Sequence, residues 1–281
     1  MIDFFTMTIN NAEILKKTYE SLNKNIEGIK LKNCNLYLNV DPHPNNENIH
    51  NLKIIGEQFF KEVIFNVPEN CNCNSAFKWG LNNFKSDYLF IIEANKCIDK
   101  KFNINDLIEK LNLNQNIVEV SLSPPVKNNS GELLYLTSHP SLWKKSWLKY
   151  IYQYFSDYLN YEYQLRELAL LDNKIGYSIA TPKNIYLNHI GKKYKTDRKY
   201  ILANSSTDEE INEINLKNGE WHLNIYNIFK SNKSCKTNKL NTFYKKIDDK
   251  EWIYRWTGIW KYVNNNNYYL RHLKKSYKCY K

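Results

Sequence analysis

A short apolar run that ends abruptly in polar side chains constrains the fold of this chain more than any other stretch. Residues 88–92, Tyr-Leu-Phe-Ile-Ile, are aromatic, aliphatic and β-branched, with polar clusters on both sides. This pattern is typical of a strand buried on both faces of a sheet. The run ends in Glu93, Ala94 and Asn95. Because ligands of open α/β sheets bind beyond the carboxyl ends of the strands, these residues are a candidate site, unless the strand simply turns polar at the surface.

The first hundred residues alternate between two hydrophobic patterns. Apolar runs typical of strands cover residues 2–9, 36–40, 63–67 and 88–92. Apolar residues at helical spacing cover residues 14–26, 49–60 and 75–84, and Asn10 and Asn11 can cap the first of these helices. Strands and helices that alternate at this spacing predict an α/β fold, with a mainly parallel central sheet and helices on both faces.

The pattern is less regular beyond residue 100. It predicts a helix over 105–113, a strand over 118–122, a turn at 128–131 and a returning hairpin strand over 133–137. Two helices, the first rich in aromatic residues, are expected over 141–155 and 161–171, and a short strand at 185–187. Residues 201–281 combine clustered lysines and aromatic residues with little clear period, and we interpret them as a C-terminal appendage to a main domain of residues 1–200.

Composition narrows the class of partner. The formal net charge is +11 and 15% of the residues are aromatic, which suits an anion such as a sugar nucleotide, a nucleic acid or a lipid surface. The six cysteines form no recognisable zinc quartet, so reduced thiols are expected. The sequence shows neither a leader peptide nor a membrane span, so we expect a soluble cytoplasmic protein, free or peripheral at a membrane.

Several short motifs follow one another in a defined order. Asn70, Ala76, Lys78 and Gly80 precede Ser-Asp-Tyr-Leu at 86–89, and the Glu-Ala-Asn tripeptide follows. In this order they resemble the Asn-rich helix and the Asp-x-Asp strand of nucleotide-sugar-dependent glycosyltransferases of the GT-A fold, similar to family 2. The resemblance implies a Rossmann-like GT-A sheet in which residues 1–100 form the nucleotide-sugar half and residues 101–200 the acceptor half, with the basic, aromatic appendage at 201–281.

The resemblance also implies an activity and a set of site residues. A sugar would pass from a nucleotide diphosphate donor, in the first place a UDP-sugar, to a hydroxyl of a glycan or glycoconjugate, with inversion. Glu162 matches the start of the helix that bears the catalytic base, and Ser138 to Trp143 resembles an acceptor-side segment. The donor-binding candidates are Thr6, Thr8, Asp41, Asn70, Lys78, Glu93, Lys192 and Lys193. Each has a structural alternative, such as an Asx turn for Asp41 or a solvated lysine for Lys78.

The metal motif departs from the family pattern. Glu93, Asn95 and His189 are the candidate ligands for Mn²⁺ or Mg²⁺, which would neutralise the leaving diphosphate. Asn95 stands where the family has an acid, and an amide brings no negative charge, so metal affinity should fall. Three hypotheses stay open: an enzyme with a weak metal site, a metal-independent enzyme that uses cations such as Lys192 and Lys193 after Gly191, or a fold whose catalysis has decayed.

Two rival functions belong to other classes of protein. The first is a catalytically silent module that still binds nucleotide or glycan. The second is a nucleic-acid-binding protein that uses the Lys- and Tyr-rich tail, whose affinity would fall steeply with salt.

Overall fold

The structure is a computed structural model that describes most of the chain up to residue 190. The described ranges there are 1–9, 11–41, 49–68, 73–124, 126–127, 133–134, 140–156, 161–181 and 184–190. Further on it describes 221, 224–225, 228, 252–254 and 260–262. The chain divides into two compact units, one of Met1–Arg166 with Lys174–Tyr194 and the other of Glu167–Asn173 with Lys195–Lys281.

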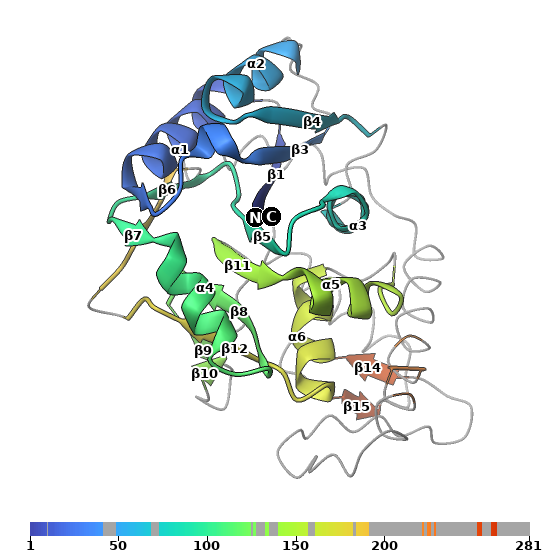
Figure 1. Cartoon of the computed structure of the whole chain (residues 1–281). Helices are drawn as coiled ribbons and strands as arrows, with labels where there is room; N and C mark the ends of the chain where they lie inside the picture. Colours follow the sequence, from blue (N-terminus) through green and yellow to red (C-terminus); the bar gives the residue numbers. More distant parts are fainter. Residues whose placement is uncertain are drawn as a thin grey trace. The chain divides into compact units, whose positions relative to one another are not determined.

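A seven-stranded sheet forms the centre of the first unit (Figure 1). Its strand order is β12-β8-β11-β5-β1-β3-β4. The bounds are β1 Ile2–Ile9, β3 Asn35–Asp41, β4 Glu62–Asn66, β5 Tyr88–Ile91, β8 Ile117–Ser121, β11 Ser141–Lys144 and β12 Ile175–Ser178. Strand β11 is antiparallel to both of its neighbours, and the other pairings are parallel. The predicted mainly parallel sheet is therefore confirmed.

Helices cover both faces of this sheet. Their bounds are α1 Ala12–Asn25, α2 Ile49–Phe59, α3 Cys73–Asn83, α4 Ile104–Asn112, α5 Lys145–Tyr152 and α6 Tyr161–Leu171, with a short 3-10 helix at Leu31–Asn33. On one face Phe4 of β1 shares a buried cluster with Leu15 of α1, Leu52 of α2 and Leu107 of α4. On the other face Phe5 packs against α3. Side chains that alternate along β1 thus fill two separate layers of the core.

Local chemistry sets where these elements begin. The Asn11 side chain accepts a hydrogen bond from the Ile14 N–H at 3.0 Å and so caps α1, as predicted for this residue. Helix α3 lies so close to β1 that a Cβ built on Gly80 would lie 2.8 Å from the Phe5 ring. Only a residue without a side chain permits this approach.

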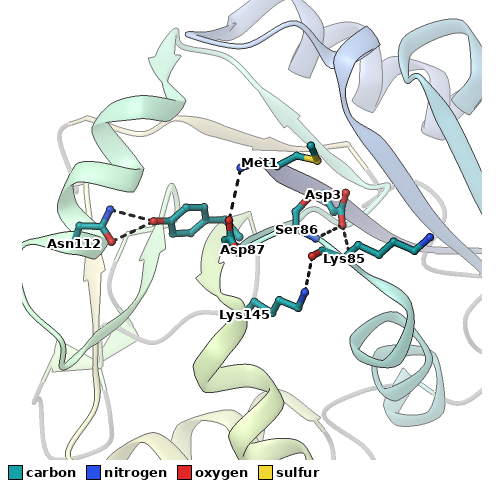
Figure 2. A network of polar contacts seen from close by, with 8 residues as sticks. Met1, Asp3, Lys85, Ser86, Asp87, Asn112 and Lys145 are labelled. Carbon is teal, nitrogen blue, oxygen red and sulfur yellow. Dashed lines mark hydrogen bonds and ion pairs between the residues drawn. The ribbon is translucent and has the colours of Figure 1, made fainter.

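A buried carboxylate organises the amino end of the sheet (Figure 2). Asp3 of β1 is fully buried, and its Oδ2 accepts hydrogen bonds from the Lys85 and Ser86 N–H groups at 2.8 and 2.9 Å. Its Oδ1 accepts a longer bond from Asn35 at 3.3 Å. The segment that leads into β5 is therefore hydrogen-bonded to β1 just ahead, along the chain, of the residues of β5 that pair with β1.

Four two-stranded ladders complete the described structure. β2 Ile26–Glu27 pairs with β7 Phe102–Asn103, and β6 Lys96–Ile98 pairs with β13 Leu187–His189. β9 Val126–Lys127 pairs with β10 Leu133–Leu134, which confirms the predicted hairpin, although its turn at 128–131 lies outside the described residues. In the second unit β14 Trp252–Tyr254 pairs with β15 Trp260–Tyr262. Within the described residues, every helix is too short or too polar to cross a bilayer.

Two boundaries predicted from the sequence are wrong. The helix expected over 141–155 begins only at Lys145, because residues 141–144 form β11 between β5 and β8. Leu142 and Trp143 are buried on opposite faces of the sheet, and two consecutive apolar residues fit such a strand as well as they fit a helix. The strand expected at 185–187 lies two residues later, in β13.

Candidate active site

The carboxyl edge of the sheet gathers the ends of several strands. Ile9 at the end of β1 is in register with Asp41 at the end of β3, and Ser141 at the start of β11 lies between Ile91 and Ser121. Asp41 is thus placed at this edge by its backbone, while its side chain lies outside the described residues. Strand β5 ends at the same edge and releases Glu93, Ala94 and Asn95 there.

Helix α1 fixes this tripeptide from one side. The Thr18 hydroxyl donates a hydrogen bond to the Ala94 carbonyl at 2.5 Å, and Ala94 itself is buried. The Lys96 N–H donates to the Glu93 carbonyl at 3.2 Å, which closes the turn. The two flanking side chains, Glu93 and Asn95, are consequently held at the strand end by a backbone that cannot shift without breaking a buried hydrogen bond.

The β6 and β13 pairing brings His189 to the same place. His189 is the register partner of Lys96, and the next residue, Ile190, donates its N–H to the Asn95 carbonyl at 3.0 Å. Residues about ninety positions apart in the chain therefore become neighbours. Of the residues proposed as metal ligands, the structure brings the backbones of Glu93, Asn95 and His189 together.

A lysine that the sequence analysis did not select also lies here. Lys96 Nζ lies 3.9 Å from Glu93 Oε2, and each side chain is about a quarter exposed, at 23% and 26%. The pair places a positive charge at the end of β5. A lysine three residues after an acid is common in any sequence, so only the turn geometry shows that these two side chains meet.

The donor atoms in this cluster allow a test of whether a divalent cation fits. The Asn95 Oδ1 atom is buried and has no hydrogen-bond partner among the described residues, so this oxygen is available as a ligand for a cation. A carboxylate, an amide oxygen and an imidazole can all bind Mn²⁺, but they supply a single negative charge. In the described part of the chain, three or more His, Cys, Asp or Glu side chains nowhere gather in a metal-binding group. The donor atoms are of the types that a divalent cation accepts, and their single negative charge predicts low affinity for one.

The two threonines of β1 lie within the strand, ahead of its carboxyl end. Thr6 is fully buried next to the Tyr19 hydroxyl of α1, where burial raises the pKa of Tyr19 above its ordinary value. Thr8, two residues closer to the strand end, is 6% exposed. Thr8 is therefore the better placed of the two for contact with a ligand at the carboxyl edge.

The start of α6 is anchored to the start of α3. Gln164 accepts a hydrogen bond from the Ser156 N–H at 2.6 Å and donates to the Ser156 carbonyl at 2.8 Å and to Asn74 Oδ1 at 3.3 Å. The Tyr161 and Phe77 rings stack with centroids 4.6 Å apart. Helix α3 follows the carboxyl end of β4, so the first turn of α3 lies toward the carboxyl edge of the sheet. The contacts between the two helix starts hold Glu162, in the first turn of α6, on that same side of the sheet.

Other proposed residues lie elsewhere or outside the described residues. Lys78 extends from α3 over the Tyr152 ring of α5, with its Nζ 5.8 Å from the ring centre. Trp143 and Trp147 stack with centroids 5.8 Å apart and are 1% and 5% exposed, so both rings belong to the core. The expectations for Asn70, Lys192, Lys193 and the segment 138–139 fall on residues that the structure does not describe.

Comparison with solved structures defines the class of fold. S. aureus TarS 1-349 in complex with UDP superposes with a TM-score of 0.50 at 12% identity, over 88% of this chain and 76% of that one. The mannosyltransferase PcManGT from Pyrobaculum calidifontis, in complex with GDP-Man and Mn²⁺, superposes with a TM-score of 0.51 at 9% identity, over 82% of this chain and 73% of that one. The architecture is thus a Rossmann-like fold of the GT-A type.

Sequence comparison adds no closer relationship. No known family profile matches the chain, and no curated protein matches it by sequence.

Proposed function

We propose that the protein is a glycosyltransferase that moves a sugar from a nucleotide diphosphate donor, in the first place a UDP-sugar, to a hydroxyl of a glycan or glycoconjugate with inversion. One observation carries this proposal. The backbones of Glu93, Asn95 and His189 lie together at the carboxyl edge of a GT-A-type sheet, where ligands of such sheets bind. The nucleotide and nucleotide sugar held by the two similar structures support the choice of donor class.

The leaving diphosphate requires positive charge, and two sources are consistent with the site. Lys96 supplies one cation directly at the strand end, paired with Glu93 in the absence of ligand. A donor phosphate that approached could take Lys96 as a partner, since the pair is loose and partly exposed. A divalent cation held by Glu93, Asn95 and His189 would supply Lewis-acid stabilisation of the same charge.

Glu162 is proposed as the general base. It would remove the proton from the acceptor hydroxyl as that oxygen attacks the anomeric carbon, while the bond to the diphosphate breaks on the opposite side. Such proton transfer contributes about 10²- to 10⁴-fold, and positioning and charge stabilisation supply the rest. The contacts of Gln164 and Tyr161 give the start of α6 the rigidity that this role requires.

The remaining assignments are part of the same proposal. Thr6, Thr8, Asp41, Asn70 and Lys78 would contribute to the donor half in residues 1–100. Lys192 and Lys193 would close over the diphosphate from the acceptor half in residues 101–200. Residues 201–281 would form an appendage to this domain.

The test measures ligand binding before turnover. Wild-type protein is titrated calorimetrically with UDP, GDP and their sugar conjugates, with and without Mn²⁺, and its thermal stability is followed in parallel. A ligand at about 100 times its Kd should stabilise the folded state by about 2.7 kcal/mol. Lys96→Ala should weaken UDP binding about tenfold or more if the ammonium contacts phosphate. Absence of any nucleotide binding at millimolar concentration would refute the proposal.

A catalytically silent nucleotide-binding protein is the second candidate. The Lys96 ion pair to Glu93 and the amide at Asn95 favour it, because both reduce the negative charge that a catalytic metal needs. The two candidates separate in one assay. A silent protein would bind UDP but release none from UDP-sugars over a panel of glycan acceptors, whereas an enzyme would release UDP with at least one acceptor.

A further inference from the structure

Five lysines lie along the amino edge of the sheet, on the opposite side from the candidate active site. They are Lys85 before β5, Lys144 at the end of β11, Lys145 and Lys149 in α5, and Lys174 before β12. We call this set, with the exposed apolar residues beside it, the amino-edge surface. All of its members belong to the first unit.

Contacts show that these lysines form one continuous group. Lys145 and Lys149 lie over the same Phe84 ring, with their Nζ atoms 5.6 and 5.5 Å from its centre. The Lys145 side chain donates to the Lys85 carbonyl. Figure 2 shows Lys85 and Lys145 together with Met1 and Asp87 at the start of β5. Lys144 adjoins this group in the chain, and Lys174 is the charged neighbour that acts on its pKa.

Two of these lysines have another lysine as the charged neighbour that acts on their pKa. Partial burial and the neighbouring Lys145 lower the pKa of Lys149, and partial burial and the neighbouring Lys174 lower the pKa of Lys144. The exposed acid in this group, Asp87, lies 4.0 Å from the N-terminal amine. Like charges held together raise the free energy of the unbound protein, and an anionic partner would remove that cost.

Large apolar side chains project from the same edge. Leu113 is 62% exposed and Ile175 is 51% exposed. Both are interleaved with the lysines: the Asn114 carbonyl, next to Leu113, accepts a hydrogen bond from Lys144 at 3.2 Å, and Ile175 directly follows Lys174. Met1, at 83% exposed, lies beside Asp87.

We propose that the amino-edge surface docks the protein on an anionic membrane. The lysines would contact lipid phosphates, and the aliphatic side chains would enter the boundary between headgroups and acyl chains. A soluble polyanion would use the lysines but would gain nothing from exposed aliphatic residues. The docked protein would keep its carboxyl edge, with Glu93 and His189, turned away from the lipid. This inference is independent of the proposed function.

Vesicle co-sedimentation tests the proposal. Wild-type protein should bind phosphatidylcholine vesicles that contain roughly one third phosphatidylglycerol, and should not bind pure phosphatidylcholine vesicles. Raising the salt from about 0.1 M to about 1 M shortens the screening length from about 10 Å to about 3 Å and should release most of the protein. Equal binding to neutral and anionic vesicles, or binding to neither, would overturn the proposal.

One triple variant and a matched control separate the charge of this surface from the net charge of the protein. The triple substitution Lys85→Ala, Lys149→Ala, Lys174→Ala should weaken binding roughly 100-fold, at about fivefold for each lysine. The control, Lys16→Ala, Lys17→Ala, Lys53→Ala, removes the same charge from α1 and α2 and should bind within about twofold of wild type. Equal losses in both triple variants would mean that net charge alone drives binding and would overturn the proposal.

The apolar contribution distinguishes a membrane from a soluble polyanion. Leu113→Ser with Ile175→Ser should weaken vesicle binding about tenfold while leaving any binding to heparin unchanged. If vesicle binding is unchanged in this variant and heparin binds as tightly as vesicles do, the surface is a polyanion site and the proposal fails. Calorimetric titration of each variant with UDP keeps this result separate from the fate of the nucleotide site, and far-UV circular dichroism verifies that each variant is folded.

Discussion

Replacing Glu167 with Gln should stabilise the protein at neutral and alkaline pH but have little effect at acidic pH. Glu167 lies in the second half of α6 and is 7% exposed. Burial of its carboxyl raises the pKa from 4.5 to about 8. The folded protein therefore keeps a proton near pH 7 that the unfolded chain has lost.

The sign of the effect follows from this difference in bound protons. Between pH 4.5 and about 8, unfolding releases the proton of Glu167, so raising the pH favours the unfolded state. The free energy of unfolding of the wild type should fall by about 2 to 3 kcal/mol from pH 5.5 to pH 7.5 through this group alone. Gln has nearly the same shape as the protonated acid and does not titrate, so Glu167→Gln should lack this loss.

Urea unfolding at a series of pH values measures the difference. Other titrating groups are shared by the two proteins and cancel when wild type and variant are compared. Glu109→Gln, at an exposed position of α4, is the matched control and should follow the wild type at every pH. A constant difference between Glu167→Gln and wild type over this pH range would refute the argument that burial holds the proton on Glu167.

Four further substitutions test other parts of the structure. Asp3→Ala removes the acceptor of two N–H groups, one buried and one partly buried, and should lower the free energy of unfolding by about 2 to 4 kcal/mol, measured by urea titration at pH 7. Gly80→Ala forces a methyl group against the Phe5 ring and should cost about 1 to 3 kcal/mol in the same assay, whereas a stabilised variant would show that α3 can move away. Asn95→Asp adds a carboxylate and should tighten Mn²⁺ binding about tenfold by calorimetry; an unchanged Kd would place the metal elsewhere. Glu162→Gln should lower turnover at least about 100-fold with donor affinity nearly unchanged, and near-wild-type turnover would remove Glu162 from the role of base.

The fold was largely predictable because the strands of the first half are long enough to show their pattern. The run at 88–92 is apolar throughout, the run at 36–40 is apolar except for Asn39, and the helices between them carry a clear apolar face. Short elements were not predictable. Strand β12, Ile-Gly-Tyr-Ser, has four residues, one of them Gly. The apolar residues of β11 directly precede α5, and in the sequence they fit the first turn of that helix equally well.

The candidate site was predictable to the extent that a strand end is visible in the sequence. Glu93 and Asn95 follow directly from the end of β5, and the family resemblance pointed to His189. The ion pair of Lys96 with Glu93 was missed, because it depends on a turn of three residues whose shape is set by the Thr18 hydrogen bond from α1. Long-range pairing of this kind leaves no local trace in the sequence.

Strand β11 has a consequence for how the chain folds during synthesis. Among the described strands, β11 alone joins the group formed by β4, β3, β1 and β5 to the pair formed by β8 and β12. Until residue 144 has been made, the outer edge of β5 has no partner, and its apolar sequence can pair with a neighbouring chain. At about 5 to 20 residues per second this interval lasts about 3 to 10 seconds. A ribosome-bound chain stopped between β5 and β11 should therefore be the species most prone to aggregate and the one that chaperones protect.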